Sequence, residues 1–358
     1  MRASARCLLV LVVVLAPLLV GCTPTPPGRT PLVVFAAGSL IIPFGQLETA
    51  FEAAHPEIDV RLEYHGSIQV IRYVTDIRQE IDVVASADHA LMPMLLYATV
   101  NPDSDEPYAD WTIRFAGNRL ALAYTDRSAF HDEINADNWY EVIARDGVRL
   151  GLSDPRFDPS GYRSLMALKL AETVYGVRGI FDSVLRGQFE TPITWFWDDG
   201  ETLISVPELL ATKADSRVML RGSSIHLASL VESGDVDYAF LYESVIRQQG
   251  FKMVELPAGV NLGDEALAED YSAVRVHLDF QRFTSVRPEF TGEPISYGVT
   301  IPSNAPQPEA AAQFIEFLLG DEGRAIMAAN HHPLRDPLEV DHYEALPASL
   351  QTVVAPGP

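Results

Sequence analysis

Residues 31–54 read PLVVFAAGSLIIPFGQLETAFEAA, and this stretch decides the class of fold. Its first part, from Pro31 to Ala36, is an apolar run of the kind that forms a strand buried on both faces. After Gly38 and Ser39, large apolar residues recur at helical spacing as far as Phe51. A buried strand that passes directly into a helix is the repeating unit of α/β folds, so we predict that class.

The alternation of strand and helix continues along most of the chain. Further strands are predicted over 60–64, 81–85, 120–124, 148–152, 238–242 and 295–301, and helices from Ser67, from Gly161, up to Gly234 and over 308–319. The stretch 189–214 lacks a clean period. We interpret its Trp195 and Trp197 as an aromatic patch under an irregular loop rather than the lining of a ligand cleft. With 358 residues, the chain is long enough for two globular units.

The N-terminus is predicted to be a targeting segment. Two arginines precede an uncharged run from Cys7 to Val20, which is the layout of a secretory signal peptide and is shorter than the about 20 apolar residues of a membrane span. The sequence Leu19-Val20-Gly21-Cys22 resembles the lipobox of bacterial lipoproteins, which implies a signal peptide over 1–21 and acylation of Cys22. The alternative is an ordinary signal peptide with an incidental cysteine. The Pro-rich segment 22–31 is predicted to be a stiff tether.

Charge and cysteine content exclude several classes of partner and site. The chain has 26 Lys+Arg against 49 Asp+Glu, a formal net charge of −23 at pH 7. Nucleic acid and anionic membrane surfaces repel such a protein, so we expect no nucleic-acid partner and no membrane contact except through the lipid anchor. Cys7 and Cys22 are the only cysteines, which excludes a disulfide framework and a cysteine-based zinc site from the mature domains.

Small polar residues recur where a predicted strand passes into a predicted helix. They are Gly38-Ser39, Gly66-Ser67 and Asp158-Pro159-Ser160-Gly161. A helix N-terminus offers unpaired N–H groups that suit an anion, although a serine there also caps its own helix. Because the protein is strongly acidic, an anion would have to be held by local neutral donors, namely backbone N–H groups and Ser or Tyr hydroxyls.

Motifs of common enzyme classes are absent from the sequence. It contains no G-x-S-x-G, no Walker loop and no H-E-x-x-H. The adjacent His331 and His332 are expected to be a solvent-exposed loop pair rather than a metal site, and Asp198-Asp199 is expected to lie on the surface. We therefore expect no enzymatic activity and no cofactor.

Several motifs carry a resemblance to a known family. Phe35-Ala36-Ala37-Gly38-Ser39-Leu40 resembles the opening of molybdate- and tungstate-binding proteins of ABC importers. Four further segments are similar to the archaeal-type branch of that family: 82–88 (DVVASAD), 115–119 (FAGNR), 161–166 (GYRSLM) and 230–234 (LVESG). The resemblance runs from about residue 32 to 335 and keeps its motifs in order.

The resemblance implies a type II periplasmic-binding-protein fold, in which two α/β lobes are hinged by two crossover strands and close around a ligand. The first lobe is expected over 32–117 and 295–345, and the second over 118–294. Residues 346–358 are expected to be a C-terminal tail.

The resemblance also implies a binding site. Gly38, Ser39 and Ser67 are expected to bind the oxyanion from the first lobe, and Asp158, Pro159, Ser160 and Tyr242 from the second. In the archaeal branch an Asp and a Glu also coordinate the metal. Asp158 occupies the Asp position, but Ser224 stands where the Glu belongs. Either Asp158 alone still coordinates Mo or W, or it caps its helix and leaves a tetrahedral oxyanion held by neutral donors, Ser224 included. We expect the second arrangement.

The function that follows from the resemblance is that of a receptor. We expect a monomeric lipoprotein outside the cytoplasmic membrane that binds molybdate or tungstate and delivers it to an ABC permease. A receptor for another tetrahedral oxyanion such as sulfate is the alternative, and a secreted enzyme is a further one.

Overall fold

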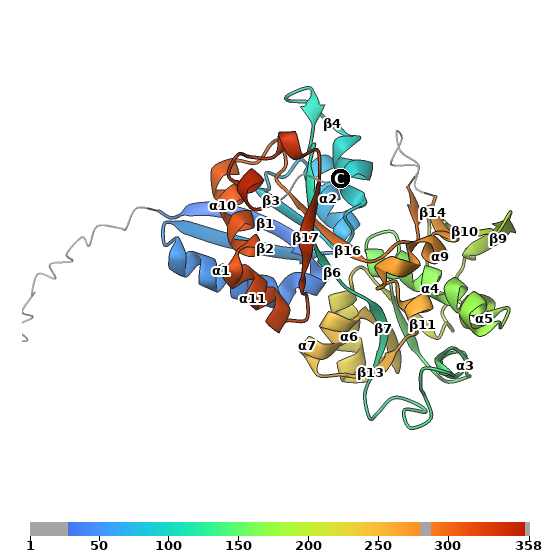
Figure 1. Ribbon diagram of the computed structural model, residues 1–358. Coiled ribbons are helices and arrows are strands. Elements are labelled where there is room, and N and C mark those ends of the chain that lie inside the picture. The colour runs from blue at the N-terminus through green and yellow to red at the C-terminus, as the bar shows by residue number, and fades with distance from the viewer. Residues whose placement is uncertain (1–27, 280–287, 355–358) are drawn as a thin grey trace, which may run out of the picture.

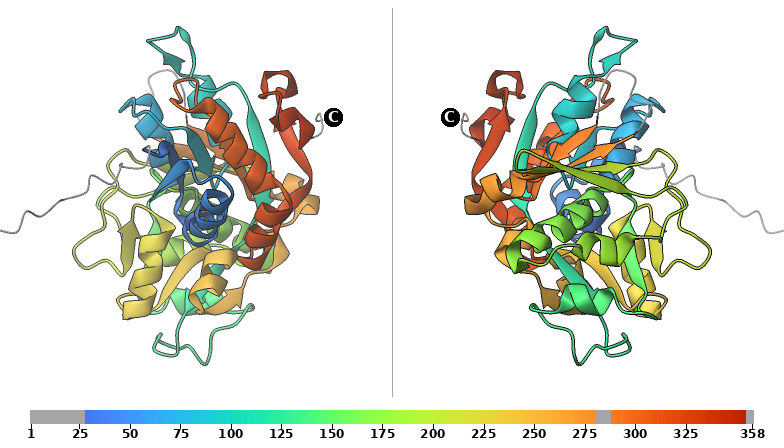
Figure 2. Two further views of the ribbon diagram at one scale, coloured as in Figure 1. Left: turned by 90° about the vertical axis from the view of Figure 1, so that its left-hand side faces the viewer. Right: turned by 90° about the vertical axis from the view of Figure 1, so that its right-hand side faces the viewer.

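The computed structural model describes residues 28–279 and 288–354. The predicted signal peptide and Cys22 lie outside these residues. None of the helices described there is both long and apolar enough to cross a membrane. The chain forms two lobes (Figure 1), and the N-terminal and C-terminal parts of the chain, blue and red, share one of them (Figure 2).

Lobe 1 is built on a six-stranded sheet with the order β17-β6-β16-β3-β1-β2. Strand β1, next to the edge strand β2, pairs in parallel with β2 and β3, whereas β16 runs antiparallel to β3 and β6. The strands are β1 Thr30–Ala37, β2 Ile58–His65, β3 Val83–Ser86, β6 Thr112–Gly117, β16 Ser296–Thr300 and β17 Leu334–Asp341. Leu32 and residues 34–37 of β1 are buried, as the sequence predicts, whereas Pro31 is exposed and Val33 is half-buried.

Aromatic packing holds the main helices of lobe 1 together. Phe314 meets Phe51 edge-on at a ring-centroid distance of 5.3 Å and Phe44 at 6.1 Å. Aromatic pairs of this geometry stabilise a core beyond the area that they bury. The helices are α1 Ile41–Ala54, α2 Ser67–Thr75, α10 Pro308–Leu319 and α11 Asp321–Ala329, with short helical segments at η1 Gly38–Leu40, η2 Met92–Tyr97, η4 Tyr343–Ala345 and η5 Leu350–Thr352.

Lobe 2 is built on a five-stranded sheet with the order β11-β8-β12-β7-β13. The strands are β7 Leu120–Tyr124, β8 Leu150–Ser153, β11 Val218–Arg221, β12 Tyr238–Tyr242 and β13 Lys252–Glu255. The long helix α4 Pro159–Tyr175 is buried along most of its length. The other helical segments of this lobe are α3 Trp139–Ile143, α5 Ile180–Leu185, α6 Ser224–Ser233, α7 Glu243–Gln249, α8 Ala258–Asn261, η3 Glu265–Leu267 and α9 Ala268–Ser272.

The stretch 189–214 is more regular than the sequence indicates. It contains the antiparallel pair β9 Thr194–Asp198 and β10 Glu201–Val206, within a sheet ordered β15-β14-β10-β9 that also holds β14 Val274–Leu278 and β15 Glu289–Thr291. Every residue of β9 is exposed, Trp195 and Trp197 included, so the strand has no buried face to impose an alternating pattern. The prediction of an irregular loop over these aromatics is therefore wrong. A small pair, β4 Val100–Asn101 and β5 Glu106–Pro107, completes the strands.

The chain passes between the lobes at two places. The first passage leads from β6 to β7 through Asn118, and the second enters β16 after Ile295. The C-terminal segment does not hang free as a tail, because Leu346, Leu350 and Val354 are buried and join the core cluster. At the other end, β1 begins at Thr30, inside the segment expected to be a tether.

The histidine pair does not lie wholly in solvent as expected. His331 is exposed, but His332 is fully buried, and its ring meets Tyr297 edge-on at 5.4 Å. His332 Nδ1 lies 3.1 Å from the carbonyl oxygen of Asn330. Burial lowers the pKa of His332 to about 4, so the ring is neutral at physiological pH.

The buried His332 predicts a loss of stability in acid. The unfolded chain protonates this histidine below about pH 6.5, whereas the folded chain does not until about pH 4, so stability falls as the pH drops through that window. For the isolated group the slope is about 1.4 kcal/mol per pH unit. Urea unfolding of His332→Phe at pH 7 and pH 5 should show a smaller pH dependence than the wild type. His331→Asn, at an exposed position with a φ of 61°, should keep the wild-type slope.

Candidate functional site

The polar strand ends of the two lobes face each other. From lobe 1 come Gly38 and Ser39 after β1, Ser67 after β2, and Ala87 after β3. From lobe 2 come the start of α4, the start of α6, and Tyr242 at the end of β12. All eight residues that the sequence analysis assigned to the site are buried: Gly38, Ser39, Ser67, Asp158, Pro159, Ser160, Ser224 and Tyr242.

The lobes are in direct contact around these residues. The backbone N–H of Ile68, in the first turn of α2, donates a hydrogen bond of 3.1 Å to the carbonyl oxygen of Phe157 in lobe 2. Gly38 lies against Ile225 and Ser223 of lobe 2. Such bonds between lobes exist only when the hinge is closed, so the structure shows the closed arrangement.

Gly66 lies where the backbones of the two lobes come close together. A Cβ atom at this position would lie 2.3 Å from the carbonyl oxygen of Phe157 and 2.8 Å from that of Gly222, both in lobe 2. The backbone at Gly66 has φ −64° and ψ 142°, a conformation that any residue adopts. The lobe contact, and not the local backbone, therefore requires glycine here.

Two hydroxyls of the site have their oxygen atoms occupied as acceptors. Ser67 Oγ accepts from the backbone N–H of Ala87 at 2.9 Å, and Tyr242 Oη accepts from Arg163 Nη1 at 2.7 Å. Each donor keeps its hydrogen, so the proton of each hydroxyl is left for another partner. Burial raises the pKa of Tyr242 well above its ordinary value, so that hydroxyl stays protonated.

A third hydroxyl, that of Ser39, belongs to a chain that crosses the lobe boundary. Asn118 Nδ2 donates to Tyr297 Oη at 3.0 Å, and Tyr297 Oη lies 2.8 Å from Ser39 Oγ. Because the Asn118 amide supplies a hydrogen to Tyr297, the tyrosine can pass its own hydrogen to Ser39 and leave the serine proton free. Asn118 also donates to Ser244 Oγ at 2.8 Å, which fixes the amide.

Asp158 joins the N-termini of two helices. It is the N-cap of α4, where one carboxylate oxygen accepts from Ser160 N at 2.9 Å, and its other oxygen accepts from Ser224 N at the start of α6, also at 2.9 Å. Burial raises the pKa of Asp158, and the two backbone hydrogen bonds oppose that shift. The sequence analysis left two arrangements for Asp158, coordination of the metal or capping of its helix. In the structure Asp158 caps its helix.

The other residues at the start of α4, Pro159 and Ser160, have no free hydrogen-bond donor to offer an anion. Pro159 has no backbone N–H, and it occupies the first helical position, where that group is not needed. Ser160 donates its N–H to Asp158 and its hydroxyl to Ser153 Oγ at 2.8 Å. By contrast, no other described residue forms a hydrogen bond with the hydroxyl of Ser224, which is buried at the start of α6.

Several residues of this network were not assigned to the site from the sequence. Arg163 carried one sequence signal, because it is a cation in a helix turn of otherwise small and apolar residues, 161–167. Asn118 lies in the motif 115–119 that carries the family resemblance, but that motif was not connected with the site, and Tyr297 carried no signal because its strand reads as an ordinary structural segment. Their roles depend on partners more than 100 residues away in sequence.

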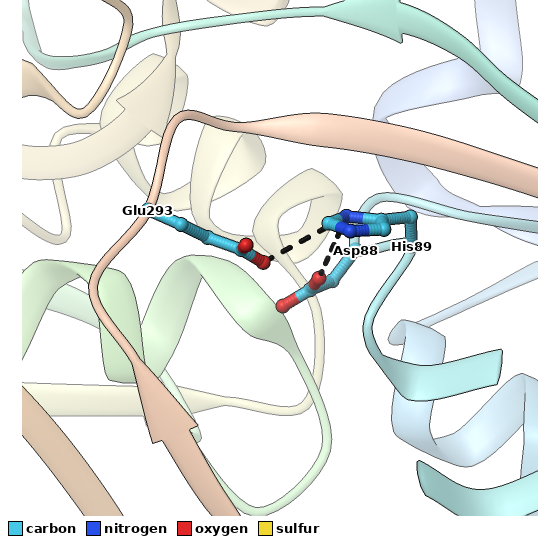
Figure 3. Close-up of side chains that lie close together, drawn as sticks. All are labelled: Asp88, His89 and Glu293. Atoms are coloured by element: carbon cyan, nitrogen blue, oxygen red, sulfur yellow. Dashed lines mark ion pairs between the residues drawn. The ribbon is translucent and has the colours of Figure 1, made fainter. Parts of the chain in front are cut away.

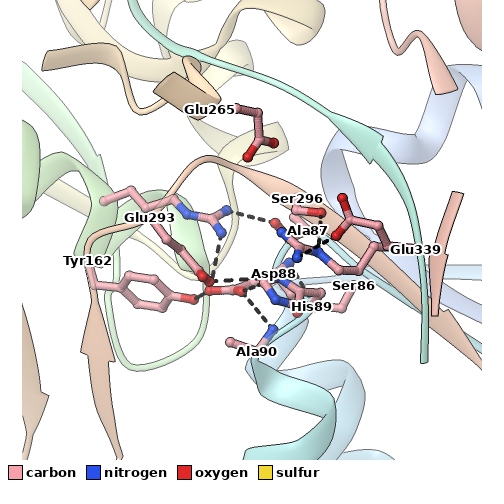
Figure 4. A network of polar contacts seen from close by, with 12 residues as sticks. Ser86, Ala87, Asp88, His89, Ala90, Tyr162, Glu265, Glu293, Ser296 and Glu339 are labelled. Carbon is pink, nitrogen blue, oxygen red and sulfur yellow. Dashed lines mark hydrogen bonds and ion pairs between the residues drawn. The ribbon is translucent and has the colours of Figure 1, made fainter. Parts of the chain in front are cut away.

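A group of ionisable side chains lies beside the network, at the entry to β16. His89 Nδ1 is 3.9 Å from Asp88 Oδ1 and 3.7 Å from Glu293 Oε1 (Figure 3). The hydroxyl of Tyr162 points at Asp88, which follows Ala87 directly (Figure 4). Burial raises the pKa of Glu293 to about 7 and lowers that of His89 to about 4. Asp88 is also paired with Arg163 at 3.2 Å, so its negative charge is already balanced by a cation of the protein.

Most of the chain matches a known protein family. The family model described as bacterial extracellular solute-binding protein matches residues 32–331. The chain belongs to this family. This solute-binding protein is 36% identical to the molybdate/tungstate-binding protein WtpA of Pyrococcus abyssi over 332 residues, which cover 89% of this chain and 90% of the relative. It is 38% identical to a solute-binding protein of Methanococcus maripaludis over 288 residues, 80% and 82% of the two chains.

Solved structures agree with the two-lobed fold. The periplasmic molybdate-binding protein of Azotobacter vinelandii superposes with a TM-score of 0.53 at 18% identity, covering 85% of this chain and 99% of that one. The sulfate-binding protein SubI from Mycobacterium tuberculosis gives a TM-score of 0.52 at 14% identity, with coverages of 86% and 88%. At such identities the likeness shows the fold alone. The predicted family resemblance and two-lobed α/β fold are confirmed, and membership of an extracellular family places the mature protein outside the cytoplasm.

The contact at Gly66 predicts that a single methyl group hinders closure. Gly66→Ala should fold, because the backbone conformation allows alanine, but its Cβ would clash with the Phe157 carbonyl in the closed state. We expect solute affinity to fall at least about tenfold, which corresponds to about 1.4 kcal/mol. Gly45→Ala, in α1 with open space around the added Cβ, is the matched control. Wild-type affinity together with ligand-induced compaction of Gly66→Ala in small-angle scattering would contradict this prediction.

Proposed function

We propose that this solute-binding protein is the receptor of an ABC importer for molybdate or tungstate. The oxyanion lies between the lobes, held by Gly38, Ser39 and Ser67 of lobe 1 and by Ser224 and Tyr242 of lobe 2. The protein acts as a monomer, is held at the membrane through acylated Cys22, and delivers its ligand to the permease. It needs no cofactor for this.

The observation that supports the proposal is that hydroxyls from both lobes are free to donate hydrogen bonds. Ser67 and Tyr242 already accept hydrogen bonds through their oxygen atoms, so each presents a proton to whatever lies between the lobes. Ser39 can do the same through its bond with Tyr297. Donors supplied from both lobes suit an anion without protons, since such an anion accepts hydrogen bonds at every oxygen. The relative WtpA is named for binding molybdate and tungstate, which are anions of this kind.

The same geometry supports a tetrahedral, hydrogen-bonded oxyanion. Both oxygen atoms of Asp158 accept backbone hydrogen bonds, so its carboxylate is turned towards the helix N-termini. Ser224 supplies a hydroxyl where a second carboxylate would otherwise coordinate the metal. A hydroxyl donates to an oxyanion, whereas an ionised carboxylate repels it.

A sulfate receptor and an enzyme are the alternative functions. Ser224 in place of a Glu favours sulfate, because a site without carboxylate ligands fits any fully deprotonated tetrahedral dianion. An enzyme is disfavoured by the partners of the hydroxyls. Ser67 and Tyr242 are bonded to N–H donors and Ser39 to another hydroxyl, so none of them is paired with a base that would make it a nucleophile.

Calorimetric titration of the soluble domain, from about Thr30, tests the function. Molybdate and tungstate should bind with similar affinity, because they are nearly equal in size and charge, and both should bind more tightly than sulfate and phosphate. Tighter binding of sulfate would replace the proposal by the sulfate receptor. Failure of all four anions to bind would contradict an oxyanion receptor.

The role of Ser224 is tested by substitution and spectroscopy. A hydrogen bond to a charged acceptor contributes roughly 1.5–3 kcal/mol, so Ser224→Ala should weaken molybdate binding about ten- to a hundredfold. Ser224→Glu should shift the metal-edge absorption spectrum towards six-coordination. Ser233→Ala, at an exposed serine in the last turn of the same helix, should leave both readouts unchanged. A six-coordinate spectrum of the wild-type complex would show that the tetrahedral arrangement is wrong.

A further inference from the structure

Arg163 is a fully buried cation whose partners come from both lobes. It lies on α4 of lobe 2, and its side chain is 2% exposed. Within lobe 2, Nη1 donates to Tyr242 Oη at 2.7 Å. Towards lobe 1, Nη1 donates to the carbonyl oxygen of Ala87 at 2.7 Å, and Nη2 lies 3.2 Å from Asp88 Oδ2. Because a buried charge is costly without partners, the guanidinium holds these three groups in one arrangement.

The chemistry of the guanidinium sets the direction of the Tyr242 hydroxyl. Arginine has five N–H donors and no acceptor, so in the Arg163–Tyr242 bond the tyrosine oxygen must accept. The tyrosine proton therefore points away from Arg163, and no other described residue forms a hydrogen bond with this hydroxyl. A neutral partner that both donates and accepts, such as serine, would leave the direction undetermined.

The same guanidinium is linked to the hydroxyl of Ser67 in lobe 1. Ala87 accepts from Arg163 through its carbonyl oxygen and donates its own N–H to Ser67 Oγ at 2.9 Å. A continuous series of hydrogen bonds thus joins Ser67, Ala87, Arg163 and Tyr242. At its two ends are the side-chain hydroxyls of Ser67 and Tyr242, which bind the anion in the proposed function. The bond from Arg163 to Ala87 is the step that crosses from one lobe to the other, so opening the hinge breaks the series there.

We propose that Arg163 is a positioning residue that directs the Tyr242 hydroxyl proton towards the bound anion, and that thereby favours anions without a proton over protonated ones. The proposal deepens the proposed function and rests on it. With Ser67 and Tyr242 directed to donate, the closed site offers fewer acceptors to an anion that carries a proton. A buried donor without an acceptor is unfavourable, so hydrogen phosphate binds more weakly than the fully deprotonated oxyanions. Without Arg163, the Tyr242 hydroxyl can rotate and accept from the protonated anion.

The experiment compares two buried cations of the same helix. Arg163→Met removes the series of bonds between the lobes. Lys169→Met removes another buried cation of α4, one that pairs with Glu172 inside lobe 2 and does not reach lobe 1. Molybdate and phosphate affinities are measured by calorimetry near neutral pH, with circular dichroism to verify folding. Arg163→Met should weaken molybdate about ten- to a hundredfold and lower the molybdate-to-phosphate affinity ratio at least about tenfold. Lys169→Met should keep the wild-type ratio.

A double-mutant cycle with Tyr242→Phe separates positioning from a merely structural role. If Arg163 acts through the tyrosine hydroxyl, then in the Tyr242→Phe background Arg163→Met should change the affinity ratio by no more than about twofold. If Arg163→Met does not fold, Arg163→Lys replaces it, since lysine keeps the charge but lacks the planar set of donors that reaches Tyr242, Ala87 and Asp88 together.

The possible outcomes are distinct. A wild-type protein that binds none of the anions contradicts the proposed function. A wild-type protein that binds molybdate, with equal affinity ratios for the Arg163 and Lys169 variants, overturns the role of Arg163 and leaves the receptor function intact. An equally large effect of Arg163→Met on the ratio in the Tyr242→Phe background would show that Arg163 does not act through that hydroxyl.

Discussion

The site depends on the backbone contact between the turn after β2 and the loop before α4. Gly66 and Ile68 of lobe 1 touch the Phe157 carbonyl of lobe 2 at distances that leave no room for a side chain at Gly66. Beside this contact, the bond from Arg163 to Ala87 links Ser67 of lobe 1 to Tyr242 of lobe 2. Lobe closure and the assembly of the donor set are therefore the same event, and a ligand that gains hydrogen bonds from both lobes stabilises the closed state.

Because the formal net charge of the protein is −23, the anion site that we propose needs local electrostatic compensation. The carboxylate nearest the donors, Asp158, is bonded to the N-termini of α4 and α6, where the helix dipoles favour a negative charge. The buried cation Arg163 is balanced by Asp88, so it acts through the direction of its hydrogen bonds more than through net charge. In the site that we propose, neutral hydroxyls are therefore the groups that bind the anion.

Local sequence patterns predicted most of the helices and strands, but they predicted less well which residues are buried or exposed. The strands 120–124 and 238–242 and the helix 308–319 have the bounds that the sequence indicates, because the strands are unbroken apolar runs and the helix lies between Pro308 and Gly320. The exposed strand β9 and the buried His332 were missed. β9 pairs with the neighbouring β10 at the edge of a sheet and has no buried face to give it an alternating pattern. His332 takes its environment from Tyr297, which is packed against it and comes from another segment of the chain.

The sequence by itself determined the α/β class, the family resemblance and the small polar residues at the strand ends, because these depend on residues close together in the chain. The tertiary structure alone decided that the hydroxyls of Tyr242 and Ser67 are free to donate, since each accepts a hydrogen bond from another segment: Tyr242 from Arg163, and Ser67 from Ala87. It also decided that Asp158 joins α4 to α6. A hydroxyl can donate or accept, and only the geometry of its neighbours selects between the two.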